Sequence, residues 1–514
     1  MRSKKAIYNI VSSLVLQVVV LISGFIVPKL IISKFGSDVN GLLSSIAQFL
    51  AYISLLESGI GPVVRSSLYK PLAEKDNKTI KNILKASERF FRIIALIFVI
   101  YLVFLSVVYP FLVQKEFGYL YTFSLVLIIS VSTFFEYYFG MTYKLYLQAD
   151  QKTYVTSIIQ IITYILNIIF VVILVKIKAN IQVIKLFSGF AFILRPIIQN
   201  IYIKKKYNIN LDDADKNYKL DKKWDGLAQH IAAVVHNNTD ITILTIFSKL
   251  SEVSVYSVYA MITRGVKSII SAFSSGIDAS FGDMIVKNEN DTLNKSFSTY
   301  ELFYFTTITI FYTCTIILIV PFVSVYMKNI TDTNYIRPLF GYLIVISEFI
   351  WAIRMPYSSI TLAAGHFKET RKGAWVEAIT NIVISILLVI KYGIVGVAIG
   401  TLIAMLIRTI EFVYHTNKYI LKRNIIINVK KIIFVIIETI IIVLIVRFLP
   451  INFKFDSYIN WIIYAIIVFI IASIITIGIN FIVYKDDRKN LKQLLNKNFN
   501  KLFRRRKSAW KHIL

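Results

Sequence analysis

The sequence has 514 residues, of which 56% are hydrophobic, and it carries a formal net charge of +29. Its mean hydropathy of +0.66 and its repeated apolar runs of roughly 18 or more residues exclude a soluble globular protein. The single cysteine, Cys314, excludes an intramolecular disulfide, a cysteine-based zinc site and an iron–sulfur cluster.

Apolar runs of bilayer length predict an all-α fold, a polytopic membrane protein with about fourteen transmembrane helices. The first run lacks a small-residue cleavage site, so we expect a transmembrane helix there rather than a signal peptide. In chain order, the helices are expected roughly at residues 10–32, 42–69, 84–109, 119–143, 153–175, 181–203, 227–249, 253–282, 297–325, 336–365, 373–391, 394–417, 426–449 and 458–484.

The distribution of basic residues predicts the orientation of the chain. With the amino terminus inside, about 40 of the 58 Lys and Arg residues fall in cytoplasmic segments and about 12 in outer loops and helix ends. This asymmetry predicts that both termini are cytoplasmic. Because the excess charge lies in short loops and in the tail, we expect it to contact anionic lipid rather than nucleic acid.

Two polar segments interrupt the hydrophobic pattern. Residues 204–226 form the longest break and predict a hinge, where the lone Asp213-Ala-Asp215 motif is typical of a solvated linker rather than a metal site. The tail, residues 485–514, has apolar residues at helical spacing among Lys and Arg. We expect an interfacial amphipathic helix there, with a disordered basic tail as the alternative.

An internal repeat divides the chain into two similar halves. Residues 33–60 align with 248–277, 147–154 with 363–370, and 192–202 with 405–415, at offsets of about 213 to 217 residues. The repeat predicts two six-helix lobes in the same orientation, which is typical of alternating access. The predicted parts are the amino-terminal lobe (1–209), a cytoplasmic inter-lobe linker (210–226), the carboxy-terminal lobe (227–423), helices thirteen and fourteen (424–484) and the basic tail (485–514).

Charged residues within the predicted helices are the candidate site, because charges are costly in a bilayer and usually functional. In "LLESGIGPVVRSSLYK" (55–70), Glu57 and Arg65 flank a Gly-Ile-Gly-Pro sequence that predicts a broken helix. The candidate substrate-binding cations are Arg65, Arg195, Arg264, Lys267, Arg354 and Arg408, and the candidate coupling carboxylates are Glu57, Asp240 and Glu348.

Structural explanations compete for these residues. Arg65 lies near the predicted end of helix two, where its side chain can reach the interface. The other cations can form structural ion pairs, for which Glu136, Glu377 and Glu411 are the available carboxylates. If the cations instead line a cavity, they attract phosphate, because Arg binds pyrophosphate oxygens in a bidentate manner. An exporter of organic cations would need the opposite charge.

The chain resembles the polysaccharide-export flippases (Wzx or O-unit type) of the multidrug/oligosaccharidyl-lipid/polysaccharide (MOP) superfamily. The resemblance rests on fourteen helices arranged as two sixes plus two, on the sequence of residues 27–70, on "SEVSVYSVYAMI" and on "LAAGHFKET". It implies a V-shaped pair of lobes in a bacterial cytoplasmic membrane. It also implies translocation of undecaprenyl-diphosphate-linked oligosaccharides for capsule, O-antigen or cell-wall assembly, with Arg65, Arg264 and Arg354 matching the family's cationic cavity.

Several function classes stay open at this point. A multidrug or lipid II exporter shares the fold, whereas a membrane polymerase or glycosyltransferase is disfavoured by the short outer loops. No nucleotide-binding motif is present, so we expect no cofactor. We expect transport to be coupled to a sodium gradient, a proton gradient or the membrane potential. The expected partners are the lipid-linked glycan, a polysaccharide polymerase and glycosyltransferases, and we expect a monomer.

Overall fold

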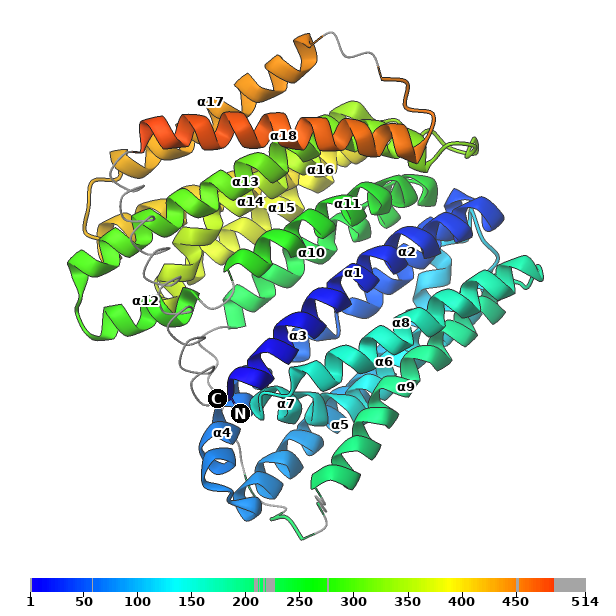
Figure 1. Cartoon of the computed structure of the whole chain (residues 1–514). Coiled ribbons are helices and arrows are strands. Elements are labelled where there is room, and N and C mark those ends of the chain that lie inside the picture. Colours follow the sequence, from blue (N-terminus) through cyan, green and yellow to red (C-terminus); the bar gives the residue numbers. More distant parts are fainter. Residues whose placement is uncertain are drawn as a thin grey trace, which may run out of the picture. The chain divides into compact units, whose positions relative to one another are not determined.

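The structure is a computed structural model in which the described residues form helices, turns and loops. It describes residues 2–57, 59–207, 227–274, 277–449 and 453–484, with a few single positions between 211 and 218. Within these ranges it confirms the all-α fold class. In chain order the helices are α1 (Arg2–Phe35), α2 (Ser37–Ala51), α3 (Ser54–Glu57), α4 (Ile60–Glu74), α5 (Asn77–Val113), α6 (Tyr119–Phe135), the π-helical turn η1 (Glu136–Gly140), α7 (Met141–Ala149), α8 (Thr153–Lys176), α9 (Ile181–Tyr207), α10 (Leu227–Phe247), α11 (Leu250–Ser274), α12 (Ile277–Val286), α13 (Asn290–Tyr326), α14 (Pro338–Ala363), α15 (Arg371–Tyr392), α16 (Ile394–His415), the π-helical turn η2 (Thr416–Ile420), α17 (Ile426–Phe448) and α18 (Tyr458–Val483) (Figure 1).

Eleven helical segments in the described ranges are long and apolar enough to cross a membrane, so the chain is a multi-pass membrane protein. The three further predicted spans, at 227–249, 253–282 and 426–449, are also largely helical. They correspond to α10, to α11 with the first residues of α12, and to α17. Each of these helices carries at least one charged side chain, such as Asp240 in α10, Lys267 in α11 and Glu438 in α17. These three predicted spans are therefore helices whose apolar runs contain polar or charged side chains.

The chain divides into two compact units. The first unit comprises Met1–Met261, Asn329–Tyr335 and Ala378–Thr401, and the second comprises Ile262–Lys328, Ile336–Glu377 and Leu402–Leu514. Because both units are discontinuous, α11, α15 and α16 each contribute residues to both of them.

The lobe boundaries given above (1–209, 227–423 and 424–484) stay predictions. The predicted tail, 485–514, lies outside the described residues, as does most of the linker, 210–226.

The predicted second helix is broken into three helices, α2, α3 and α4. Gly59 precedes α4 with φ +84°, a left-handed conformation that favours glycine. Pro62 lies in the first turn of α4, where a missing N–H costs no helical hydrogen bond. The Gly-Ile-Gly-Pro sequence therefore restarts the helix, as predicted, and Glu57 and Arg65 lie on helices on either side of the break.

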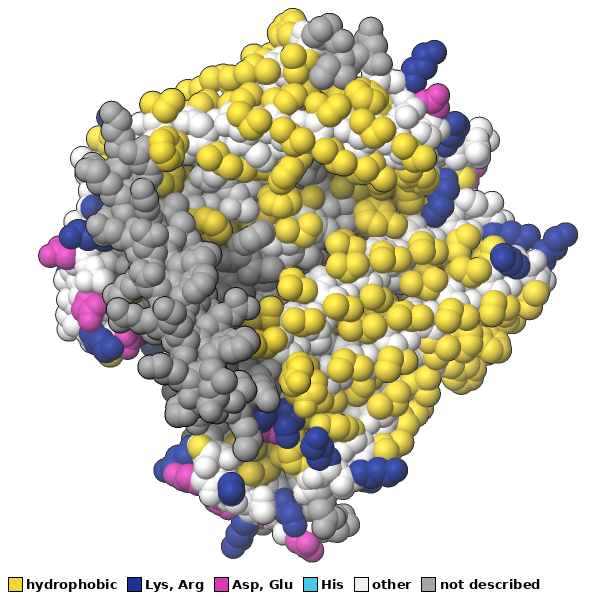
Figure 2. Space-filling view, in the orientation of Figure 1, with side chains coloured by type: hydrophobic (Ala, Val, Ile, Leu, Met, Phe, Trp, Pro, Cys, Tyr) yellow, Lys and Arg dark blue, Asp and Glu magenta, His cyan; other side chains and the backbone are white. Residues whose placement is uncertain are grey.

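The two units present apolar side chains along the outer helices. Only 11% of the most apolar window of α1 is buried inside the protein, against 61% for α13. Figure 2 shows hydrophobic side chains along α1, α8, α9 and α18, with Lys and Arg gathered near helix ends. Such long apolar surfaces match a hydrocarbon environment, whereas on a soluble protein they would cause aggregation.

Candidate functional site

Seven charged residues form the candidate site in the second unit, which we call the charge cluster. Its members are Arg264, Lys267, Glu348, Arg354, Glu377, Arg408 and Glu411.

Ion pairs link six of these seven residues. The ammonium of Lys267 lies 3.0 Å from the carboxylate of Glu348. The carboxylate of Glu377 lies 2.9 Å from the guanidinium of Arg354 and 3.3 Å from that of Arg408. Arg408 also pairs with Glu411, three residues further along α16. Four of the six candidate cations thus belong to the second unit, and three of these four are in ion pairs.

Arg408 is buried and has several polar partners. Its side chain is 1% exposed, it donates a hydrogen bond of 2.9 Å to the carbonyl of Thr370, and its guanidinium lies 4.3 Å from the centre of the Phe412 ring. The guanidinium also contacts the carboxylates of Glu377 and Glu411, so both its charge and its N–H donors have partners. These contacts are the ones that a structural ion pair of Arg408 would make, with Glu377 and Glu411 as its counter-ions.

Arg264 differs from the other cations of the charge cluster. Its side chain is exposed, and among the described residues it has no ion-pair or hydrogen-bond partner. It lies one turn before Lys267 on α11, and the positive charges of Arg264 and Arg354 both repel the Lys267 ammonium. With every member ionised, the cluster holds four positive and three negative charges, so one cation is in excess.

The charge cluster can bind an anion with the chemistry it presents. The exposed guanidinium of Arg264 offers several N–H donors, which match a phosphate or diphosphate group. Lys267, one turn after Arg264 on α11, is paired with Glu348 and also lies 4.0 Å from the centre of the Trp351 ring. An arriving anion would relieve the repulsion between these cations without breaking an existing ion pair of Arg264.

The first unit holds Glu57 and Arg65 in separate polar contacts. The hydroxyl of Tyr137 donates a hydrogen bond of 3.1 Å to Glu57, and Arg65 donates one of 3.1 Å to the side-chain oxygen of Gln148. Tyr137 lies in the π-helical turn η1, whose first residue, Glu136, has its carboxylate 3.6 Å from Lys144. Glu57 and Arg65 thus each have a polar partner, and these partners lie on other elements.

Asp240 lies in a buried group of hydroxyl and amide side chains in the first unit. It is 4% exposed and accepts hydrogen bonds from the hydroxyls of Tyr256 (2.8 Å) and Thr401 (2.9 Å). Asn381 donates a hydrogen bond of 2.9 Å to Thr401, and the side-chain oxygen of Asn381 has no hydrogen-bond partner among the described residues. This group brings together oxygen atoms from α10, α11, α15 and α16.

Arg195 belongs to the first unit and contacts aromatic rings. Its Nε donates a hydrogen bond of 2.8 Å to the hydroxyl of Thr163. Its guanidinium lies 4.6 Å from the Tyr164 ring and 4.4 Å from the Phe192 ring, which are cation–π distances. Arg195 and Arg408 are at matching positions in the predicted repeat, but their surroundings differ.

Some residues of these sites carry no charge and escaped the sequence analysis. Tyr137, Tyr256, Thr401 and Asn381 are common residue types in apolar helices, and nothing in their local sequence distinguishes them. A weak signal existed for Tyr256 and Thr401, because each lies in a helix that also carries a candidate cation. In the part of the chain that the structure describes, no group of three or more His, Cys, Asp or Glu side chains is placed to hold a metal ion.

Comparison with solved structures identifies the fold. A structure described as the lipid II flippase MurJ in an inward closed conformation matches with a TM-score of 0.65 and 18% identity, over 91% of this chain and 98% of that chain. An inward-facing MATE-family multidrug resistance transporter of the MOP superfamily matches with a TM-score of 0.57 and 14% identity, over 78% of this chain and 94% of that chain.

A third solved structure is described as a MOP superfamily transporter from Pyrococcus furiosus with a binding pocket of reverse polarity. It matches with a TM-score of 0.50 and 14% identity, over 80% of this chain and 96% of that chain. No protein-family model and no curated protein matches the sequence. The chain therefore has the fold of the MOP-superfamily transporters and flippases.

Proposed function

We propose that the protein is a flippase that moves undecaprenyl-diphosphate-linked oligosaccharides across the bacterial cytoplasmic membrane by alternating access, for capsule, O-antigen or cell-wall polysaccharide assembly. The observation that carries this proposal is the exposed Arg264, which has no ion-pair partner among the described residues and belongs to a charge cluster with one cation in excess. A membrane protein that keeps such a charge without a counter-ion is suited to an anionic ligand.

The diphosphate is the part of the substrate that this cluster would recognise. Arg264 would make the first contact, because its guanidinium is exposed. Lys267 and Arg354 would add electrostatic attraction while staying paired to Glu348 and Glu377. The prenyl chain would stay in lipid while the head group crosses, and no covalent bond changes, so the protein would act as a transporter rather than an enzyme.

We propose Asp240 as the first carboxylate to test for ion coupling, followed by Glu57. Asp240 is buried among hydroxyl groups, where a bound proton or sodium ion would lower the cost of burying its charge. Glu57 has one hydroxyl donor, Tyr137, and lies beside the helix break. Glu348 is a weaker candidate, because its carboxylate is already paired with Lys267.

A second substrate, lipid II, has specific support. The match to the MurJ structure covers 91% of this chain, and lipid II also carries a prenyl diphosphate. Multidrug export is the other function that the fold allows. The excess positive charge of the charge cluster disfavours it, because positive charge repels cationic drugs. The Pyrococcus furiosus transporter, whose description ties reversed pocket polarity to a different function, supports the use of charge to choose among substrates.

The surroundings that we propose follow from the same reasoning. Both termini would lie in the cytoplasm, the basic loops and tail would contact anionic lipids, and the protein would work as a monomer. A polysaccharide polymerase and glycosyltransferases would consume and supply the lipid-linked glycan.

Transport into proteoliposomes tests the proposal directly. A fluorescent undecaprenyl-diphosphate oligosaccharide, lipid II and a cationic dye would be compared, each with sodium and proton gradients imposed. We expect the oligosaccharide to be transported, and transport to fall at least tenfold in Arg264→Ala/Arg354→Ala but not in Lys70→Ala, whose side chain is 83% exposed. Preference for lipid II would change the substrate, and transport of the dye alone, from folded protein, would refute the flippase proposal.

A further inference from the structure

Glu438 is a buried acid on α17 that the proposed transport site does not use. Its side chain is 2% exposed, and neither carboxyl oxygen has a hydrogen-bond partner among the described residues. A buried carboxylate without partners is strongly disfavoured in an apolar medium, so such a group is neutralised or bound.

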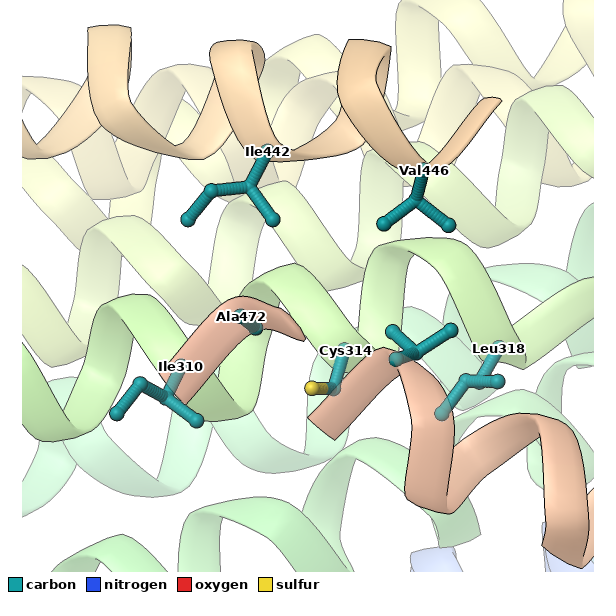
Figure 3. Close-up of a cluster of buried hydrophobic side chains, with 7 residues drawn as sticks. Ile310, Cys314, Leu318, Ile442, Val446 and Ala472 are labelled. Carbon is teal, nitrogen blue, oxygen red and sulfur yellow. The ribbon is translucent and has the colours of Figure 1, made fainter. Parts of the chain in front are cut away.

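The packing of α17 on α13 fixes the level at which Glu438 lies. Asn428 and Lys431, ten and seven residues before Glu438, both contact Glu301 of α13. Beyond Glu438 on the same stripe, Ile442 and Val446 pack with residues of α13 in one apolar cluster (Figure 3). The two helices therefore run parallel, and Glu438 lies at the level of the α13 turn that contains Thr309.

Helix α18 packs on α13 in the opposite direction and adds another side chain at this level. Asn480 donates a hydrogen bond of 3.0 Å to Thr306, and Ala472 belongs to the same apolar cluster as Ile310. Thr476 lies midway between Asn480 and Ala472, so it falls at the level between Thr306 and Ile310. Glu438 and Thr476 thus approach the same turn of α13 from two different helices.

Hydroxyl groups at this level are also without partners. Thr309, Thr313, Thr439 and Thr476 are buried, and none of their hydroxyls has a hydrogen-bond partner in the described part of the chain. This is unusual within α13 itself, because Thr306, Thr307 and Thr315 each donate to the carbonyl four residues earlier. We call these four hydroxyls and the carboxyl of Glu438 the polar layer. Thr309 and Thr313 are adjacent in sequence to Ile310 and Cys314 of the apolar cluster, and Glu438 lies one turn before Ile442.

No positive side chain within the three helices is available to neutralise Glu438. Helix α18 contains no Asp, Glu, Lys, Arg or His residue. On α17, Lys431 is 3.0 Å from Glu301, and Arg447 lies nine residues beyond Glu438, more than two helical turns away. On α13, Lys295 lies fourteen residues before Thr309, about four helical turns away. The other charged and titratable groups of these helices are Asp291, Tyr300, Glu301, Tyr304, Tyr312, Cys314 and Tyr326 on α13, Lys430 on α17, and Tyr458 and Tyr464 on α18.

We propose that Glu438 is a proton-binding site, separate from the charge cluster, and that it is protonated at neutral pH when α17 and α18 are packed on α13. A proton is the ligand that a single buried carboxyl takes at a level where the other polar side chains are neutral hydroxyls, because it removes the charge and supplies an O–H donor for the polar layer. Loss of that proton places a charge among apolar side chains and weakens the packing of the three helices. The site therefore links proton binding to the docking of α17 and α18.

Infrared difference spectroscopy of the full-length protein in nanodiscs tests the proton directly. At pH 7 the wild type should show the carbonyl stretch of a protonated carboxyl, and Glu438→Gln, which keeps the shape of the side chain, should lack it. Thr476→Val should shift this band, because it removes one hydroxyl of the polar layer. Glu74→Gln, at a carboxylate whose side chain is 58% exposed, is the control and should leave the band unchanged. The proposal is overturned if the wild type has no such band, or if added sodium removes it at constant pH.

Thermal unfolding provides a second readout if Glu438→Gln changes expression. A carboxyl that keeps its proton in the folded protein and loses it on unfolding makes stability decrease as pH rises. The wild type should therefore lose stability relative to Glu438→Gln between pH 5 and pH 8. Parallel stability curves for the two proteins would show that Glu438 holds no proton in the folded state.

Discussion

Gly373 on α15 leaves the space that the carboxylate of Glu411 on α16 occupies. A Cβ atom at residue 373 would lie 1.5 Å from Oε2 of Glu411, far inside van der Waals contact. Glu411 also pairs with the fully buried Arg408. The close approach of the Gly373 backbone therefore fixes the position of one carboxylate of the charge cluster.

We therefore expect Gly373→Ala to displace Glu411 and to weaken its ion pair with Arg408. A lost hydrogen bond to a charged group costs about 1.5 to 3 kcal/mol of unfolding free energy. Thermal unfolding in detergent would measure this loss. Gly478→Ala is the matched control, since no atom lies within 4 Å of a Cβ built there. Equal stability of the two variants would mean that Glu411 moves aside without cost.

The two arginines Arg264 and Arg408 should respond in opposite ways to substitution by alanine. Arg264→Ala should leave stability nearly unchanged, because the side chain is exposed and unpaired among the described residues, and should weaken binding of a prenyl diphosphate about 10- to 100-fold. Arg408→Ala should destabilise the protein by about 3 kcal/mol or more, because it leaves buried carboxylates with less compensation.

Binding of a fluorescent prenyl diphosphate and thermal unfolding, measured on the same preparations, separate the two effects. Arg264→Lys keeps the charge and should retain part of the affinity. A loss of stability in Arg264→Ala as large as that in Arg408→Ala would assign a structural role to both residues.

Gly41 should be intolerant of any side chain for a reason that does not involve charge. A Cβ atom there would lie 1.8 Å from the carbonyl oxygen of Leu250, and a backbone atom cannot rotate away. We expect Gly41→Ala to lower stability by about 1 to 3 kcal/mol through overpacking. Gly24→Ala, which would only bring a Cβ within 3.9 Å of the Met261 side chain, is the control. Both would be compared by thermal unfolding, and similar curves would contradict the expected clash.

Stability should depend on Asp150 in a pH range set by its carboxyl group. Burial alone would raise the pKa of Asp150. Hydrogen bonds from Lys152 and Tyr207, with the charges of Lys152 and Lys5, outweigh burial and lower the pKa. The stabilisation is therefore present above the pKa of the unfolded chain, about 3.9, and is lost as pH falls through the folded-state pKa.

Unfolding of Asp150→Asn should show this dependence by comparison with the wild type. The variant should be less stable at pH 7, and the difference should shrink steadily as pH falls below 4. A difference that stays constant over this range would indicate that the side chain acts through packing rather than through charge.

The fold class and the helix break were predictable from local sequence, because both depend on features that are visible residue by residue. Bilayer-length apolar runs predict helices, and Gly59 with Pro62 predicts the restart at α4. The pairing within the charge cluster was not predictable. Glu348 lies close to Arg354 in sequence but pairs with Lys267, because helix packing decides which side chains meet. Glu438 was missed because a single acid in an apolar run has no local sign of a missing partner.

The π-helical turn η1 makes the first unit sensitive to chain length at one point. A π-helical turn accommodates one residue more than an α-helical turn, so α7 starts about 100° out of phase with α6. This phase shift accompanies the placement of Tyr137 against Glu57 and of Gln148 against Arg65. Deleting one residue between 136 and 140 would restore a continuous α-helix and rotate Gln148 away from Arg65. The extra residue of η1 therefore sets the rotation of α7 about its axis. Loss of a single codon there would alter the contacts of Arg65, which lies on a different helix and is itself unchanged.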